Sequence, residues 1–226
     1  VLLIKRKEII MTRYFYKETG MYIDWEQLKN LPDIDTFIDV GVGADGTPDL
    51  YQKFQEKKLV LIDPLDEAEK FYKENMQQAD AIFYKTALGE STGSLKINIE
   101  ENIGRSTILD VSDINFEGNP VEQREISVNT LDDVLKNDQL GKIGIKIDTE
   151  GYELNVILGA KKTLSNTKFV IAEVRHNHES FNGVYKLHEF ITEMHKNGFV
   201  LSMILTAKPF IADLCFEPIK ELNINS

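Results

Sequence analysis

A strand that runs directly into a glycine-rich turn and then into a helix is the strongest constraint on the fold. Residues 37–46 read F-I-D-V-G-V-G-A-D-G, an apolar run followed by the pattern G-x-G-x-x-G. Thr47 and Pro48 come next and are typical of a helix cap and a first helical residue. Glycine is needed where the chain turns tightly and where a ligand approaches the backbone too closely for a Cβ atom. The segment predicts the first strand and helix of a nucleotide-binding α/β sheet.

Short apolar runs alternate with polar, helix-forming stretches from residue 36 onward. This alternation predicts an α/β fold with a mostly parallel twisted sheet and helices on both of its faces. The predicted strands are 36–40, 59–62, 81–84, 143–147, 169–174 and 199–205. The predicted helices are 48–56, 65–76, 131–136, 152–158 and 185–196.

Two segments stand outside this alternation. Residues 94–99 and 125–128 alternate between apolar and polar side chains, and we expect them to form an inserted hairpin. Near the amino end, Trp25, Leu28 and Leu31 predict a short amphipathic helix that ends near Pro32. A chain of 226 residues suits one main domain, so we expect a cap segment over 1–35 and the main domain over 36–226.

Charge and cysteine content restrict the partners and the compartment. With 37 acidic and 26 basic side chains, the formal net charge of −11 repels polyanions and argues against nucleic acid. Cys215 is the one cysteine and lies in an apolar stretch, which predicts a buried thiol in a reducing compartment. No apolar run approaches the roughly 18 residues that a membrane span needs. We expect a soluble, cytoplasmic protein, and nothing in the sequence indicates its oligomeric state.

Two acidic residues bear on the ligand of the glycine turn. Asp63 ends the predicted strand 59–62, where nucleoside-binding folds place the acceptor for ribose hydroxyls. Asp39 lies just before Gly41, where a carboxylate would repel a pyrophosphate but attract an ammonium or a sulfonium. We therefore favour S-adenosylmethionine over a nicotinamide dinucleotide as the cofactor.

A second group of polar residues follows the predicted strand 143–147. Residues 143–153 read I-G-I-K-I-D-T-E-G-Y-E, so Asp148 and Glu150 arrive at the carboxyl end of that strand. In open α/β sheets this end faces the ligand crevice. Simple helix capping by Asp148 or Thr149 is the alternative interpretation.

Five segments, taken in order, resemble the FkbM-type S-adenosylmethionine-dependent methyltransferases. They are I-D-V-G at 38–41, T-A-L-G at 86–89, T-L-D-D at 130–133, K-I-D-T-E-G-Y-E at 146–153 and A-E-V at 172–174. The resemblance implies a Rossmann-like class I methyltransferase fold that binds the cofactor through the glycine turn, with Gly41 and Gly43, and through Asp63; the charge argument above adds Asp39 to the predicted cofactor-binding residues. It also implies that Ala87 and Leu88 lie near the adenine, and that the methyl group goes to a hydroxyl oxygen of a sugar, glycan or other small molecule (EC 2.1.1.-).

Transfer to a hydroxyl requires a group that accepts its proton. The candidates at strand ends are Asp148, Glu150, Glu173 and His176, with His176 slightly preferred because histidine titrates near neutral pH. His178 lies close by in the sequence. The same carboxylates and imidazole could instead hold a divalent metal ion, and the sequence does not decide between the two.

Two other classes of function remain open at this point. An NAD(P)-dependent oxidoreductase with a Rossmann fold would use the same glycine turn and Asp63. A non-catalytic nucleoside-binding module would need the turn but not the polar residues after 147.

Overall fold

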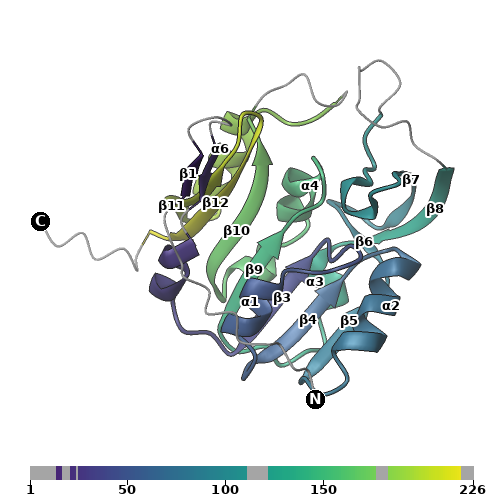
Figure 1. The fold of residues 1–226 in the computed structure, drawn as a ribbon, viewed down its shortest axis with the longest axis horizontal. Helices are drawn as coiled ribbons and strands as arrows, with labels where there is room; N and C mark the ends of the chain where they lie inside the picture. Colours follow the sequence, from purple (N-terminus) through teal and green to yellow (C-terminus); the bar gives the residue numbers. More distant parts are fainter. Residues whose placement is uncertain (1–13, 17–20, 24, 111–121, 177–182, 220–226) are drawn as a thin grey trace, which may run out of the picture.

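A computed structural model describes residues 14–16, 21–23, 25–110, 122–176 and 183–219 of the chain (Figure 1). The fold is α/β and contains a nine-stranded sheet in the order β1-β2-β11-β12-β10-β9-β3-β4-β5, with a separate three-stranded sheet in the order β6-β8-β7. Strands β3, β4, β5, β9 and β10 pair in parallel, whereas β12 lies antiparallel between β10 and β11. The prediction of a mostly parallel sheet is confirmed.

The elements have the following bounds. The strands are β1 (Tyr14–Tyr16), β2 (Met21–Ile23), β3 (Thr36–Val40), β4 (Lys58–Ile62), β5 (Ala81–Tyr84), β6 (Ala87–Leu88), β7 (Gly93–Ile99), β8 (Glu122–Asn129), β9 (Ile143–Ile147), β10 (Thr167–Arg175), β11 (Phe199–Ala207) and β12 (Ile211–Pro218). The helices are η1 (Trp25–Asn30), α1 (Pro48–Lys53), α2 (Asp66–Asn75), η2 (Ile103–Arg105), α3 (Leu131–Val134), α4 (Glu153–Leu158), α5 (Lys161–Leu164) and α6 (Leu187–Lys196).

Two apolar layers cover the two faces of the large sheet. Alternate residues of each strand point to opposite faces, so Ile38 and Phe37 belong to different layers. Helices α3, α4, α5 and α6 pack on the first face, and η1, α1 and α2 pack on the second. Helices therefore lie on both faces, as the sequence predicts.

All six predicted strands are present, and their ends differ from the predicted ones by at most two residues. The sequence showed residues 214–216 to be apolar but did not predict the strand β12 that contains them. This strand inserts between β10 and β11. Its alternation is clear in retrospect: Leu214 and Phe216 enter the first core layer, while Asp213 and Cys215 face the other way. The local alternation is compatible with a strand, but it does not specify that this strand inserts antiparallel between β10 and β11.

The inserted hairpin is also confirmed, because β7 and β8 pair antiparallel from Gly93↔Val128 to Ile99↔Glu122. The predicted short helix before Pro32 is present as a 3-10 helix. Thr47 is the N-cap residue of α1, as predicted, but its side chain makes no capping hydrogen bond, and its hydroxyl instead donates to Asp39. Leu28 and Leu31 are buried in the same layer as Phe37, so η1 shares the core of the main domain.

Candidate functional site

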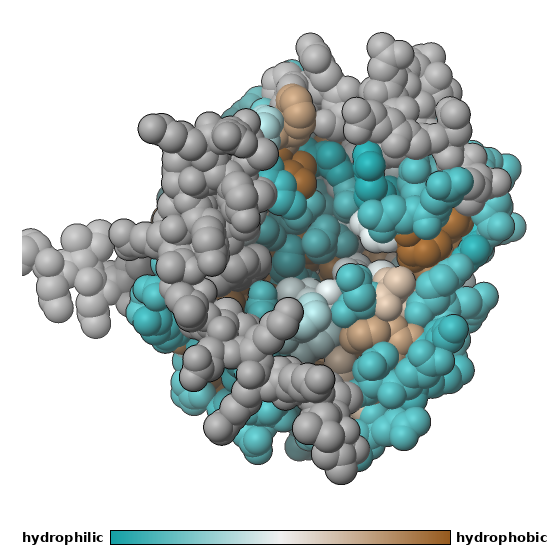
Figure 2. All heavy atoms as spheres, viewed as in Figure 1, coloured by the Kyte–Doolittle hydropathy of each residue, from teal (hydrophilic) through white to brown (hydrophobic). Residues whose placement is uncertain are grey.

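A cleft of about 210 Å³ opens at the carboxyl ends of β3, β4 and β9. The glycine turn 41–47 and residues 62–65 form one side, and residues 86–88 with 148–152 form another. Ile97 of β7 and residues 103–108 after it complete the wall. Figure 2 shows that this side of the molecule is hollowed near its centre, where polar side chains lie beside apolar ones. The small sheet thus contributes to the cleft through Ala87 and Leu88 of β6, which the family resemblance placed near the adenine, and through Ile97 of β7, which the sequence did not indicate.

The glycine turn brings two parts of the cleft into close contact. Gly41 has φ +87°, and a Cβ atom at this position would lie 1.7 Å from the backbone oxygen of Asp148. The backbone N–H of Gly41 donates to Ile62 O at 3.0 Å, and the N–H of Asp148 donates to Val40 O at 2.9 Å. Only glycine allows the end of β3 to approach the end of β9 this closely.

Asp63 organises the same turn from the end of β4. Its Oδ2 accepts a hydrogen bond from Gly43 N at 3.0 Å, and its Oδ1 accepts one from Leu65 N at 2.8 Å. The residue lines the cleft while only 5% of its surface is exposed. Burial raises its pKa to about 6, so the carboxyl group is ionised at pH 7. Each oxygen retains a second lone pair with which it can accept a hydrogen bond from a ligand.

Asp39 does not line the cleft. It is fully buried and points toward α1, where its Oδ2 accepts hydrogen bonds from the hydroxyls of Tyr51 and Thr47. Its Oδ1 has no hydrogen-bond partner among the described residues, and burial raises its pKa to about 7. Asp39 therefore supports the turn from behind, and the sequence argument that set its charge directly beside the cofactor does not match this placement.

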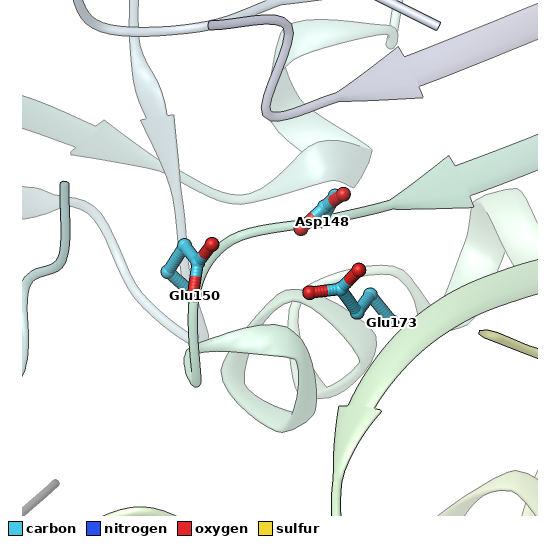
Figure 3. Close-up of side chains that lie close together, drawn as sticks. All are labelled: Asp148, Glu150 and Glu173. Carbon is cyan, nitrogen blue, oxygen red and sulfur yellow. The ribbon is translucent and has the colours of Figure 1, made fainter. Parts of the chain in front are cut away.

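The carboxylates of Asp148, Glu150 and Glu173 converge, as Figure 3 shows. One oxygen each from Asp148, Glu150 and Glu173 lies within 4.8 Å of the others. Asp148 and Glu150 follow β9 and line the cleft, while Glu173 comes from the neighbouring strand β10. The sequence predicted that these residues share one edge of the sheet, and the structure brings their side chains together. Oxygen ligands at such distances are also suited to a hard divalent cation.

The backbone at Glu150 is held in an unusual conformation. Glu150 has φ +52°, in the left-handed region that residues other than glycine seldom adopt. Its carboxylate is paired with Arg175 of β10, and its backbone oxygen accepts a hydrogen bond from Thr107 Oγ1 at 2.8 Å. These contacts fix the side chain at the wall of the cleft.

Glu153 is the scaffold of the loop that carries Asp148 and Glu150. Its Oε1 accepts hydrogen bonds from Thr149 N, Thr149 Oγ1 and Gly151 N at 2.9–3.1 Å, and its Oε2 accepts one from Tyr185 OH at 2.8 Å. Tyr152, not Asp148 or Thr149, is the N-cap residue of α4. The helix-capping alternative for Asp148 and Thr149 is therefore wrong.

Glu173 and His176 lie in different surroundings. Glu173 accepts no hydrogen bond within the described part of the chain. Burial, and then the charge of Asp148, raise its pKa well above the ordinary range of a glutamate. His176 is exposed, and its Nε2 lies 3.0 Å from Lys208 O, so this nitrogen carries a proton that it donates. His176 is not part of the carboxylate group. His178 lies outside the described residues.

With this geometry in view, comparison with known families decides the class. The sequence model of the FkbM methyltransferase domain matches residues 33–201, well over half of the 226 residues. The chain belongs to the FkbM methyltransferase family. It is an S-adenosylmethionine-dependent methyltransferase (EC 2.1.1.-), as the resemblance implied. No curated protein matches the sequence.

Several solved methyltransferase structures are similar to this FkbM-family chain at low identity. The ribosomal protein L11 methylase of Lactobacillus delbrueckii subsp. bulgaricus is 15% identical, with a TM-score of 0.46 over 84% of this chain and 73% of its own. The precorrin-6y C5,15-methyltransferase of Geobacter metallireducens GS-15 is 8% identical, with a TM-score of 0.46 over 85% and 83%. The magnesium protoporphyrin IX methyltransferase of Synechocystis PCC 6803, with bound SAH, is 12% identical, with a TM-score of 0.45 over 85% and 78%. At these scores the similarities do not bear on the acceptor of this chain.

One of the segments that carry the FkbM resemblance serves the scaffold and not the cleft. Thr130 caps α3 by accepting a hydrogen bond from Asp133 N at 3.0 Å. Asp132 accepts hydrogen bonds from Lys162 N and Thr163 N at 2.9 and 2.8 Å, at the start of α5. The T-L-D-D segment therefore links α3 to α5 through hydrogen bonds. None of the helices in the described residues is long and apolar enough to cross a membrane.

Proposed function

We propose that this FkbM-family enzyme transfers the methyl group to a hydroxyl oxygen of a sugar, glycan or other small molecule. The observation that supports this acceptor is the group of carboxylates, Asp148, Glu150 and Glu173, at the edge of the cofactor cleft. A hydroxyl must lose its proton during methylation, and we infer that the acceptor binds beside these side chains, which can accept that proton.

The residues of the cleft fit S-adenosylmethionine. Gly41 and Gly43, both with positive φ, form a cradle in which a Cβ at Gly41 would not fit. Asp63 has lone pairs that could accept hydrogen bonds from the two ribose hydroxyls, and the buried Ala87 and Leu88 would present an apolar surface to the adenine. Asp148 and Glu150, rather than Asp39, would supply the negative charge near the positively charged end of the cofactor.

Bound S-adenosylmethionine supplies an electrophilic methyl group on a sulfonium. The work left for the protein is to align the acceptor oxygen and to remove its proton. As the new oxygen–carbon bond forms and the carbon–sulfur bond breaks, the hydroxyl proton passes to a carboxylate. Glu173 is our candidate for this proton acceptor, because it has no competing hydrogen bond in the described chain and burial makes it a stronger base than an ordinary glutamate.

His176, which the sequence slightly favoured, is our second candidate for the proton acceptor. Its Nε2 is occupied by Lys208 O and its side chain is exposed, so proton transfer would have to use Nδ1. Glu150 is also less suited, because its carboxylate is already engaged in an ion pair with Arg175.

A divalent cation held by the three carboxylates is the alternative mechanism. Two of the three are already paired with positive charges of the chain, Asp148 with Lys146 and Glu150 with Arg175. This compensation favours direct proton transfer. Full activity after treatment with a chelator would support it, and loss of activity that magnesium or manganese restores would establish the metal mechanism.

The acceptor class is tested by a methyl-transfer assay with isotopically labelled cofactor across neutral sugars, glycans and sugar nucleotides. The expected product is a methyl ether, identified by mass spectrometry and by the stability of the bond to mild base. Methylation of a nitrogen or carbon atom instead would contradict the proposal. Membership of a methyltransferase family removes the support for an NAD(P)-dependent oxidoreductase or a non-catalytic nucleoside-binding module.

We further propose that the enzyme acts in the cytoplasm on a partner other than nucleic acid. Cys215 is buried and unpaired, which suits a reducing compartment, and the net charge of −11 opposes polyanionic acceptors.

A further inference from the structure

A row of charged side chains crosses one face of the large sheet behind the carboxylate group. The row contains Asp39 of β3, Lys146 of β9, Glu173 of β10 and Asp213 of β12. The strand register places Asp39 opposite Lys146, and Glu173 directly opposite Asp213. Two carboxylates in cross-strand contact repel each other unless a cation lies between them or one of them is protonated.

Lys146 is the cation at the centre of this row. It is 4% exposed, and its Nζ lies 2.9 Å from Asp213 Oδ1 and 3.3 Å from Asp148 Oδ2. Burial by itself would lower the pKa of Lys146, but Asp148, Asp213 and Glu173 raise it well above its usual range. The ammonium group is therefore charged, and its position is set by the two carboxylates that it binds.

Asp213 is in turn held by Thr206 of the adjacent strand β11. The Thr206 hydroxyl donates to Asp213 Oδ2 at 2.6 Å and accepts from Asp213 N at 3.2 Å. Thr206 is 4% exposed and Asp213 is 6% exposed, and neither lines the cofactor cleft. A continuous chain of contacts thus runs from Thr206 through Asp213 and Lys146 to Asp148 at the cleft wall.

We propose that Thr206, Asp213 and Lys146 are positioning residues for methyl transfer, which hold the Asp148 carboxylate in place where the acceptor binds. The proposal rests on the proposed hydroxyl acceptor. Because Lys146 is engaged by Asp213 and Asp148, it makes no ion pair with Glu173 in the described structure, and Glu173 remains available to accept a proton. Loss of the Thr206 hydroxyl would release one oxygen of Asp213 and loosen the whole chain of contacts.

The test compares Thr206→Val, which keeps the shape but removes the hydroxyl, with Thr206→Ser, which keeps the hydroxyl. We expect kcat for the best acceptor of the methyl-transfer screen to fall roughly tenfold or more in Thr206→Val, since small misplacements of catalytic groups are costly. Thr206→Ser should retain kcat within a fewfold. Calorimetric titration should give both variants the dissociation constant of the unmodified protein for S-adenosylhomocysteine, because Thr206 does not reach the cleft.

Unchanged kcat in Thr206→Val would overturn the proposal, and so would an equal loss in Thr206→Ser. A parallel loss of kcat and of S-adenosylhomocysteine affinity would also overturn it, since that result indicates general disruption of the fold.

A second measurement does not depend on the acceptor. In the intact chain, the ¹³C resonance of the Asp148 carboxyl carbon, assigned with Asp148→Asn, should move in Thr206→Val and stay in place in Thr206→Ser. If the unmodified protein methylates no hydroxyl, the proposed function fails, and this resonance still decides whether Thr206 positions Asp148. An unmoved resonance in Thr206→Val would refute the positioning chain by itself.

Discussion

Replacing Gly41 with alanine should damage the protein far more than the same replacement at Gly43 in the same turn. A Cβ atom at Gly41 would lie 1.7 Å from Asp148 O, whereas ordinary van der Waals contact begins at 3.4 Å. To reach ordinary contact, the end of β3 and the backbone of Asp148 would have to separate by about 1.7 Å. A Cβ atom at Gly43 would meet nothing closer than Gly104 Cα at 3.7 Å.

The separation at Gly41 would strain two backbone hydrogen bonds, from Asp148 N to Val40 O and from Gly41 N to Ile62 O. Each contributes about 0.5–1.5 kcal/mol to the free energy of unfolding, and a left-handed alanine costs a further 1–2 kcal/mol or so. We therefore expect Gly41→Ala to lower the free energy of unfolding by about 3 kcal/mol or more. Gly43→Ala incurs only the conformational cost of about 1–2 kcal/mol.

Urea denaturation of the two variants and the unmodified protein measures this difference. Calorimetric titration with S-adenosylhomocysteine should also show a larger loss of affinity for Gly41→Ala, because the same movement displaces Asp148 from the cleft. Equal destabilisation of the two variants would refute the argument, since it would mean that positive φ, and not the close approach to Asp148, requires glycine at 41.

Three further predictions follow from individual carboxyl groups. Asp63→Ala should weaken binding of S-adenosylhomocysteine by on the order of 2–3 kcal/mol in calorimetry without unfolding the domain; unchanged affinity would mean that Asp63 only supports the turn. The folded-state pKa of Asp39, about 7, lies above its unfolded value of 3.8, so its contribution to stability is present at low pH and is lost at about 1.4 kcal/mol per pH unit between these values. Asp39→Asn should therefore flatten the dependence of the free energy of unfolding on pH, and an unaltered dependence would contradict the buried position of this charge. Turnover should rise with pH as Glu173 loses its proton, at a pH above the ordinary pKa range of a glutamate. Glu173→Gln should lower kcat roughly a hundredfold or more with little effect on cofactor affinity. Full activity of that variant would show that another group accepts the proton.

The predicted strands and the glycine turn could be read from the sequence because their signals are local. A short apolar run bounded by polar residues predicts a strand, and each of the six runs recognised this way is a strand of the sheet; only the first of them is followed directly by the glycine turn. The carboxyl ends of parallel strands meet at one edge, so the grouping of Asp148, Glu150 and Glu173 could also be predicted. The family resemblance, confirmed over residues 33–201, then supplied the class of enzyme.

The direction in which individual side chains point could not be predicted from local patterns in the sequence. Asp39 alternates with Val40 along β3, and only the packing of α1 against that strand shows that its carboxylate meets Tyr51 and not the cleft. His176 follows β10 in the sequence, but its ring binds the backbone at Lys208 and does not join the carboxylates.

The sequence by itself determined the α/β order, the glycine turn and the residues that reach the carboxyl edge, because each depends on neighbours a few positions apart. The tertiary structure alone decided which charges compensate one another. Lys146 and Asp213 are 67 residues apart and come together only because β12 inserts next to β10 in a register that sets Asp213 opposite Glu173. Electrostatic energies depend on distances of a few ångströms between such groups, and those distances are fixed by the pairing of strands, which no local pattern in the chain specifies.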